Sequence, residues 1–400
     1  AATAAALTSR DAGPARSESA AAGSGRSGAQ RVRLLQVLHR HGARTPTVAW
    51  PEQLPGLPAE GTPEWDALWG RCPAVPKRTF KGGTFVPSMA TDEPCRLGSL
   101  TFAGLAQLRS LGSYLDARYS LREGCGALYP ADLAVVSTVS DRAILSAVGL
   151  LEGIYPGISA DEALAAVRLP HEMSQKLETK WATQKPAQLS CPRLGELYRH
   201  SLALLRAPLG EEREADALFF HVDHCRCLQA QGATHANCGP ALSADLDSKA
   251  YSILACVEEH SVEGAQLSGA RLVSEIHAEI EDAIAGHGAR RAGGPPQLAV
   301  HSGHDVSIIS LLRALGLPLN SVPRFASSVV IELLQHGEGQ CSGDPADEWA
   351  LRMVYFDGVP SGASCGVEVL HLPLPAWRAR VAPLLDTARS WGARCRAAGP

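Results

Sequence analysis

Short apolar, β-prone segments alternate along this chain with stretches of helical periodicity. The β-prone segments cover residues 32–38, 133–137, 297–301, 327–334 and 349–356. Between the first two, leucines recur every three or four residues from Leu105 to Leu115, as on one face of a helix. Strands that alternate with helices favour an α/β fold, with a mostly parallel central sheet flanked by helices.

The remaining stretches of the 400-residue chain differ in composition. Residues 1–30 hold mainly Ala, Ser, Gly and Arg, so they lack the apolar surface that would order them, and we predict disorder. Residues 50–97 are rich in Pro and Gly, which indicates a long ordered loop. Residues 160–290 are mostly helical in pattern, with an interruption by Cys, His and Gly at 210–245.

Charge and cysteine content narrow the class of protein. A net charge of −4 and a pI near 6.4 give little support for nucleic-acid binding. No apolar run reaches the roughly 18 residues of a membrane helix, so we predict no transmembrane segment. Eleven cysteines are consistent either with disulfides or with small buried apolar residues. The compartment stays open between a secretory or lysosomal lumen and the mitochondrion.

A histidine between two arginines directly follows the first predicted strand, in Arg40-His41-Gly42-Ala43-Arg44-Thr45-Pro46. A neutral imidazole can attack phosphorus and form a covalent intermediate. Guanidinium forks match the geometry of phosphate oxygens, and Arg40 and Arg44 flank the histidine. Gly42 is expected to let the backbone approach the phosphate. We interpret this segment as a phosphate site with His41 as nucleophile.

His304 and Asp305 follow another predicted strand, about 260 residues further on. The carboxyl ends of parallel strands meet at one edge of a sheet, so we expect the two segments to converge there. Asp305 could protonate a leaving alkoxide if burial or a nearby anion raises its pKa. His304 could donate to the phosphoryl oxygens. The competing interpretation of Asp305 is an ordinary helix cap.

Together these segments resemble the histidine phosphatase superfamily, in its acid phosphatase branch. Lys81-Gly82-Gly83, followed by Leu100-Thr101 and Gly104, is similar to a stretch of lysophosphatidic-acid-type and phosphoxylose-type members, and the segment from Val135 to Arg142 also resembles the family. The resemblance implies an α/β core over residues 31–155 and 290–390, with a helical cap domain inserted at 156–289. It implies His41 as nucleophile and Asp305 as proton donor. It further implies that Arg40, Arg44 and His304 bind phosphate, and that no metal or other cofactor takes part.

One position departs from the family pattern. A further phosphate-binding arginine usually precedes the Ser-Thr pair of the Val135 segment, and this chain has Val136 there. Arg142 is expected on the following helix, and its reach to the site is left open. Lys81 is the other candidate substitute. A catalytically weak or inactive phosphate-binding relative therefore stays an alternative.

A second cluster of potential ligands lies within residues 221–238. It consists of His221, His224, Cys225, Cys227, His235 and Cys238. Zinc binding, disulfides and histidines that line a cleft all stay open, although the spacing matches no standard zinc signature.

The predicted function is hydrolysis of a small-molecule phosphate ester. The resemblance around Lys81 favours a lysophospholipid phosphate or a sugar phosphate, and an inositol phosphate is the alternative. A phosphoryl mutase is a third interpretation, which predicts transfer between positions of one substrate. The sequence does not indicate the oligomeric state.

Overall fold

The computed structural model describes most of the chain. It covers residues 30–47, 58–74, 92–122, 133–169, 191–209, 212–233, 238, 244–286, 296–336, 348–360 and 366–396. Residues 1–29, which make up nearly all of the segment predicted to be disordered, lie outside the described residues, as does Lys81.

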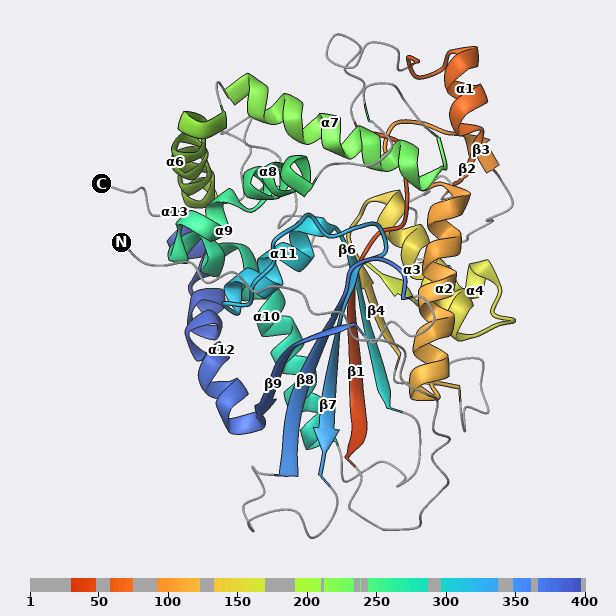
Figure 1. The fold of residues 1–400 in the computed structure, drawn as a ribbon. Coiled ribbons are helices and arrows are strands. Elements are labelled where there is room, and N and C mark those ends of the chain that lie inside the picture. Colours follow the sequence, from red (N-terminus) through yellow and green to blue (C-terminus); the bar gives the residue numbers. More distant parts are fainter. Residues whose placement is uncertain are drawn as a thin grey trace, which may run out of the picture.

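A seven-stranded mixed sheet forms the centre of the molecule (Figure 1). Its strands are β1 (Arg31–Arg40), β4 (Ala134–Ser137), β5 (Val167–Arg168), β6 (Gln297–Gly303), β7 (Ser328–Gln335), β8 (Trp349–Phe356) and β9 (Val367–Pro373), in the order β5-β4-β6-β1-β7-β8-β9. The pairings from β5 to β1 are parallel, and those from β1 to β9 are antiparallel. The predicted α/β class is confirmed. Within the antiparallel part, β7, β8 and β9 follow one another in the chain, so they can pair without the crossover that parallel strands need.

Twelve named helices surround the sheet within the described residues. They are α1 (Pro63–Trp69), α2 (Phe102–Tyr119), α3 (Asp141–Ile154), α4 (Ala160–Ala166), α6 (Pro192–Leu209), α7 (Glu212–Ala230), α8 (Ala244–Leu254), α9 (Cys256–His260), α10 (Val262–Ala285), α11 (Asp305–Ala314), α12 (Leu374–Arg389) and α13 (Trp391–Arg396). In α2 the Thr101 side chain accepts from the Gly104 N–H and caps the helix, while the predicted leucine face is buried.

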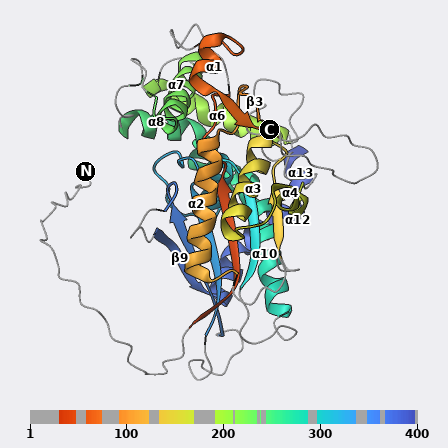
Figure 2. The same ribbon diagram turned by 90° about the vertical axis from the view of Figure 1, so that its right-hand side faces the viewer.

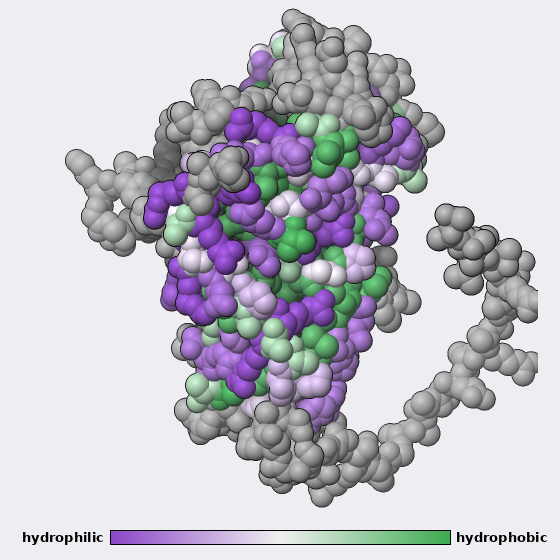
Figure 3. All heavy atoms as spheres, turned by 90° about the vertical axis from the view of Figure 1, so that its left-hand side faces the viewer, coloured by the Kyte–Doolittle hydropathy of each residue, from purple (hydrophilic) through white to green (hydrophobic). Residues whose placement is uncertain are grey.

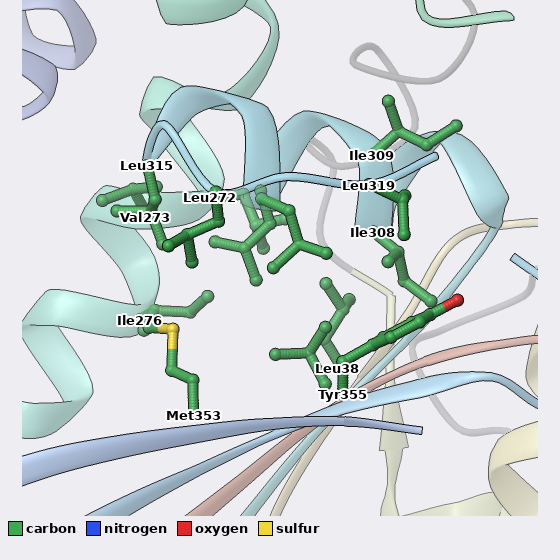
Figure 4. Close-up of a cluster of buried hydrophobic side chains, with 14 of the residues drawn as sticks. Leu38, Leu272, Val273, Ile276, Ile308, Ile309, Leu315, Leu319, Met353 and Tyr355 are labelled. Carbon is green, nitrogen blue, oxygen red and sulfur yellow. The ribbon is translucent and has the colours of Figure 1, made fainter. Parts of the chain in front are cut away.

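The two faces of the sheet carry separate apolar cores. Alternation along β1 places Leu35 and Val37 in a core with α2 and α3, which cover one face (Figure 2). Leu34 and Leu38 belong to the core on the other face, where Leu38 packs against α10 and α11 (Figure 4). Burial on both faces explains why the apolar residues of β1 stand in adjacent pairs, Leu34-Leu35 and Val37-Leu38, rather than alternating with polar residues.

Two loop predictions were wrong in part. Residues 50–97 contain α1 and a small ladder of β2 (Arg71–Pro73) with β3 (Asp92–Pro94), joined by the disulfide Cys72–Cys95. A seven-residue helix and three-residue strands are too short to show a clear period in sequence. In addition, α7 runs through the first half of the interruption predicted at 210–245.

Disulfides account for six of the described cysteines. Cys72–Cys95, Cys191–Cys395 and Cys225–Cys238 are bonded. The disulfide interpretation of the high cysteine content is thus confirmed. The second bond connects the start of α6 with α13, which are far apart in sequence.

Residues 156–289, the segment predicted as a cap domain, contribute helices both to the face of the sheet and to the region beyond its strand ends. α10 packs on the sheet with α11 and α12, while α6, α7 and α8 lie beyond the edge where β1 and β6 end (Figure 1). The division at residues 156 and 289 stays a prediction.

Within the described residues no helix is long and apolar enough to cross a membrane. On the face drawn in Figure 3, hydrophilic and apolar residues are interspersed.

Candidate active site

The two predicted motifs meet where β1 and β6 end. These strands are parallel neighbours with Arg40 opposite Gly303, and the His41 N–H donates to the Gly303 carbonyl at 3.0 Å. The rings of His41 and His304 lie edge to face with centroids 5.2 Å apart. Arg40 Nη2 lies 2.9 Å from Asp305 Oδ2. The convergence expected from the sheet topology is therefore present.

The motif loop is held in place by the start of α2. A Cβ on Gly42 would lie 2.1 Å from the Gly104 carbonyl oxygen, so only glycine fits this close backbone approach. The Thr101 N–H donates to the Ala43 carbonyl, and the Gly42 N–H donates to Ser146 Oγ on α3. In the structure, Gly42 thus serves helix packing, a role that differs from the predicted approach to phosphate.

His41 is arranged as a neutral base, with a hydrogen bond on Nδ1 and no hydrogen-bond partner on the other ring nitrogen among the described residues. Its Nδ1 lies 2.8 Å from the Gly42 carbonyl oxygen, which can only accept, so Nδ1 carries the hydrogen. Nε2 then carries the lone pair. Burial, followed by the charges of Arg142 and other nearby cations, holds the pKa of His41 well below its usual value. The imidazole therefore stays neutral in mildly acidic solution.

Arg40 is completely enclosed. Its Nη1 donates to the Pro323 carbonyl, and its guanidinium carbon lies 4.4 Å from the centre of the Phe325 ring. The same ring lies 5.8 Å from the His41 ring. Phe325 was missed in the sequence, because a single aromatic residue in a connecting segment gives no signal of its position.

Arg142, whose reach was left open in the sequence, lies at the site. It lies in the first turn of α3, is largely buried, and its Nη2 is 3.5 Å from His304 Nδ1. Burial, with Arg44 as the next cause, lowers the pKa of Arg142 to about 10, so it remains a cation. Side chains at a helix start lean back toward its N-terminus, which brings Arg142 to the site. Val136, by contrast, sits within β4 opposite His301.

Arg44 forms an ion pair with a residue of α7, a helix that lies outside the sheet. Its Nη1 and Nη2 lie 3.1 and 2.8 Å from the two carboxylate oxygens of Asp223, a buried residue of α7. This ion pair raises the pKa of Arg44 despite its burial. Asp223 was not among the predicted site residues.

Three guanidinium groups at the site share an unusual feature. The Nε atoms of Arg40, Arg44 and Arg142 are buried, and each lacks a hydrogen-bond partner among the described residues. The charges of all three groups lower the pKa of His41, in addition to the larger effect of its burial. A buried donor without a partner costs free energy, and native structures contain few of them. Three such donors around one histidine form a site suited to an anion with several acceptor oxygens.

His304 and Asp305 complete the site. Arginine can only donate, so His304 Nδ1 accepts from Arg142, and Nε2 carries the hydrogen toward Thr138 Oγ1 at 3.0 Å. Asp305 Oδ1 accepts from the Val306 N–H at the start of α11. Burial by itself raises the pKa of Asp305, but Arg40 and the neighbouring cations outweigh it, and the net pKa is lowered. The raised pKa expected for a proton donor is not what the structure has.

Of the interpretations left open for the cluster at residues 221–238, a disulfide is the one that the structure contains. Cys225 and Cys238 are bonded to each other, so neither is available as a thiolate ligand. His224 Nδ1 lies 2.8 Å from the Phe220 carbonyl oxygen within α7, and Cys227 Sγ lies 3.6 Å from Arg44 Nη1. No group of three potential metal ligands occurs in the part of the chain that the structure describes, which leaves out His235.

This fold and this pair of motifs define a class of enzyme. The similarity to known proteins supports the histidine acid phosphatase branch of the histidine phosphatase superfamily, and with it the class of phosphoric monoester hydrolases. The model of the histidine phosphatase superfamily (branch 2) matches residues 31–201, a range that includes the first motif and ends before His304.

Individual relatives are similar over most of the chain. Lysophosphatidic acid phosphatase type 6 of Mus musculus is 24% identical over 357 residues, 83% of this chain and 81% of the relative. Testicular acid phosphatase of Homo sapiens is 27% identical over 315 residues, 70% and 67% of the two chains. Among solved structures, the apo form of Hafnia alvei phytase matches with a TM-score of 0.54 and 14% identity, over 91% of this chain and 99% of that one.

Proposed function

We propose that the protein hydrolyses phosphate monoesters through a phosphohistidine at Nε2 of His41. The observation that carries this proposal is the set of three buried, unpartnered guanidinium Nε–H groups around a neutral imidazole. Fixed cations can stabilise the charge on the phosphoryl oxygens, while the lone pair on Nε2 faces no competing proton.

In the first step, Nε2 attacks phosphorus and the bond from phosphorus to the ester oxygen breaks. The leaving alkoxide takes a proton from Asp305. Arg40, which holds the pKa of Asp305 down, is also a proposed phosphate ligand. A bound phosphate dianion therefore offsets that charge and raises the pKa of Asp305, so the carboxyl gains its proton as the substrate binds.

In the second step, water attacks the phosphohistidine. The bond from phosphorus to Nε2 breaks, and the Asp305 carboxylate accepts the proton that the water loses. His41 returns to its neutral form with Nδ1 still donating to Gly42. Because Asp305 must be protonated in the first step, we expect the best activity at mildly acidic pH.

We further propose an ester with a single phosphate as substrate, a lysophospholipid phosphate or a sugar phosphate. The named relatives include lysophosphatidic acid phosphatases. On the α7 side, Arg44 is paired with Asp223, and Arg226 with Asp247. A substrate with many phosphates needs unpaired cations beyond the reaction centre. For the inositol phosphate alternative, the likeness to phytases concerns the fold only.

A panel of phosphate esters tests both parts of the proposal. Aryl phosphate, lysophosphatidic acid, a pentose phosphate and an inositol hexakisphosphate are compared with the parent enzyme and with His41→Ala. We expect turnover of the first three esters and none with His41→Ala. Phosphate binding without turnover by the parent would instead support the inactive alternative, and preference for the inositol ester would overturn the substrate assignment. Transfer of phosphate within a substrate would favour the mutase.

A further inference from the structure

Helix α7 reaches the proposed phosphate site with two side chains one turn apart, Asp223 and Cys227. Both are buried and both contact Nη1 of Arg44. Burial raises the pKa of the Cys227 thiol, so it stays uncharged. Asp223 is therefore the member of this pair that supplies a negative charge to Arg44.

The hydrogens of Arg44 can be assigned one by one. A guanidinium group has five N–H donors in a rigid plane. Nη1 uses its two hydrogens toward the Thr45 carbonyl at 2.9 Å and Asp223 Oδ2, with Cys227 Sγ as a third and longer contact at 3.6 Å, and Nη2 uses one, toward Asp223 Oδ1. The Nε–H and the second hydrogen of Nη2 remain, and Nε has no partner among the described residues. These two lie on one edge of the plane, a fork that matches two phosphate oxygens.

Charge repulsion makes such an anchor necessary. Arg44 lies near Arg40 and Arg142, and after burial, which is the largest cause, the charges of Arg44 and Arg40 lower the pKa of Arg142 further. A flexible cation next to two others moves away from them unless an opposite charge holds it. The two-point contact with Asp223 fixes both the position and the rotation of the Arg44 plane.

We propose that Asp223 is a positioning residue of the phosphatase reaction, which turns the Nε edge of Arg44 toward the phosphoryl group. This inference rests on the proposed function of the site. It also assigns a role to α7, which lies outside the sheet and was predicted as part of a helical cap. Asp223 acts through Arg44 and does not itself touch the phosphate.

The test measures kcat/KM with an aryl phosphate, and the affinity for inorganic phosphate by calorimetry. Asp223→Asn is expected to lower kcat/KM about 30-fold and phosphate affinity about 10-fold, because Arg44 loses its orientation. Asp247→Asn is the matched control, since Asp247 pairs with another α7 arginine, Arg226. We expect this control to stay within about 3-fold of the parent in both measurements.

A double-variant cycle separates positioning from a general structural role. If Asp223 acts through Arg44, then adding Asp223→Asn to Arg44→Lys costs less than about 3-fold beyond Arg44→Lys alone. Independent, multiplying losses would overturn the proposal, as would an Asp223→Asn enzyme with parental kcat/KM. If Asp223→Asn does not fold, Asp223→Ser replaces it. If both variants unfold while Asp247→Asn folds, Asp223 is a folding residue and the proposal is wrong.

The two proposals fail in different ways. If the parent hydrolyses esters and His41→Ala does not, a normal Asp223→Asn enzyme contradicts only the positioning role. If the parent has no activity, the proposed function fails, and the phosphate affinities of the parent and Asp223→Asn still decide whether Asp223 orients Arg44 for an anion.

Discussion

The molecule buries charge in two regions of one sheet, and the two regions are built differently. In the antiparallel half, Glu332 of β7 is fully buried, and both of its carboxylate oxygens accept hydrogen bonds, one from Tyr119 and one from Arg352. At the end of the parallel half, Arg40, Arg44 and Arg142 each keep one buried N–H without a partner among the described residues. The Glu332 carboxylate finds its hydrogen-bond partners within the protein. The three arginine N–H groups find acceptors only when an anion binds.

A structural ion pair and a binding site differ in the hydrogen-bond donors that they leave without partners. Both contain buried charges, so burial alone does not distinguish them. What differs is the number of donors left over, and whether they converge on a nucleophile. This distinction leads to predictions in which variants of one region change catalysis and variants of the other change stability.

The largest effect is expected for His41→Ala. Removal of the nucleophile should lower kcat/KM by about 10⁴-fold or more while the fold persists. In the parent, an alkaline rapid quench with labelled substrate should trap phosphorylated protein, because a phosphohistidine is stable in base and hydrolyses in acid, and the variant should show none. A labelled His41→Ala protein would place the nucleophile elsewhere.

Arg142→Ala should have the next largest effect. Loss of one fixed cation at the phosphoryl group is expected to lower kcat by about 10²–10³-fold. Val136→Arg tests whether a further arginine is needed. Val136 lies within β4, and Arg142 already places a cation near His304. We expect no gain in kcat from Val136→Arg in the parent. A clear gain would mean that the missing arginine at 136 does limit turnover.

Arg352→Ala tests the other region. It leaves the buried Glu332 carboxylate with Tyr119 alone, and we expect the free energy of unfolding to fall by roughly 3 kcal/mol. Arg352 lies opposite Glu332, and Glu332 lies opposite Leu35, well before β1 ends at Arg40, so kcat/KM should change by less than about 3-fold. Denaturant unfolding and steady-state kinetics measure the two quantities, and a selective loss of kcat would contradict the division.

The smallest effect concerns pH and His39, a buried residue of β1 beside the motif. Burial lowers the pKa of His39 to about 4, while the unfolded chain has a value of about 6.5. Between these values the unfolded state binds more protons, so stability falls as pH drops, by up to about 1.4 kcal/mol per pH unit. His39→Asn should flatten this part of the curve in urea unfolding from pH 7 to pH 4.5. An unchanged slope would show that other groups control the acid sensitivity.

The site was predictable where its residues are consecutive in sequence and follow a strand. Arg40, His41, His304 and Asp305 could be placed together because neighbouring parallel strands end at one edge of the sheet. Arg142 was left open because the spacing in sequence does not tell where the first turn of α3 points. Asp223 could not be predicted, since one acidic residue in a helix carries no signal until α7 is packed against the motif.

The amino-acid sequence by itself determined the class of fold, the main strands and helices, and the nucleophile and acid proposed here, since periodicity and local motifs carry that information. Only the tertiary structure decided which cations surround His41 and which charge holds Arg44. It also decided that Asp305 begins with a lowered pKa. These properties depend on distances between side chains from separate elements, and electrostatic free energies change steeply with distance and burial.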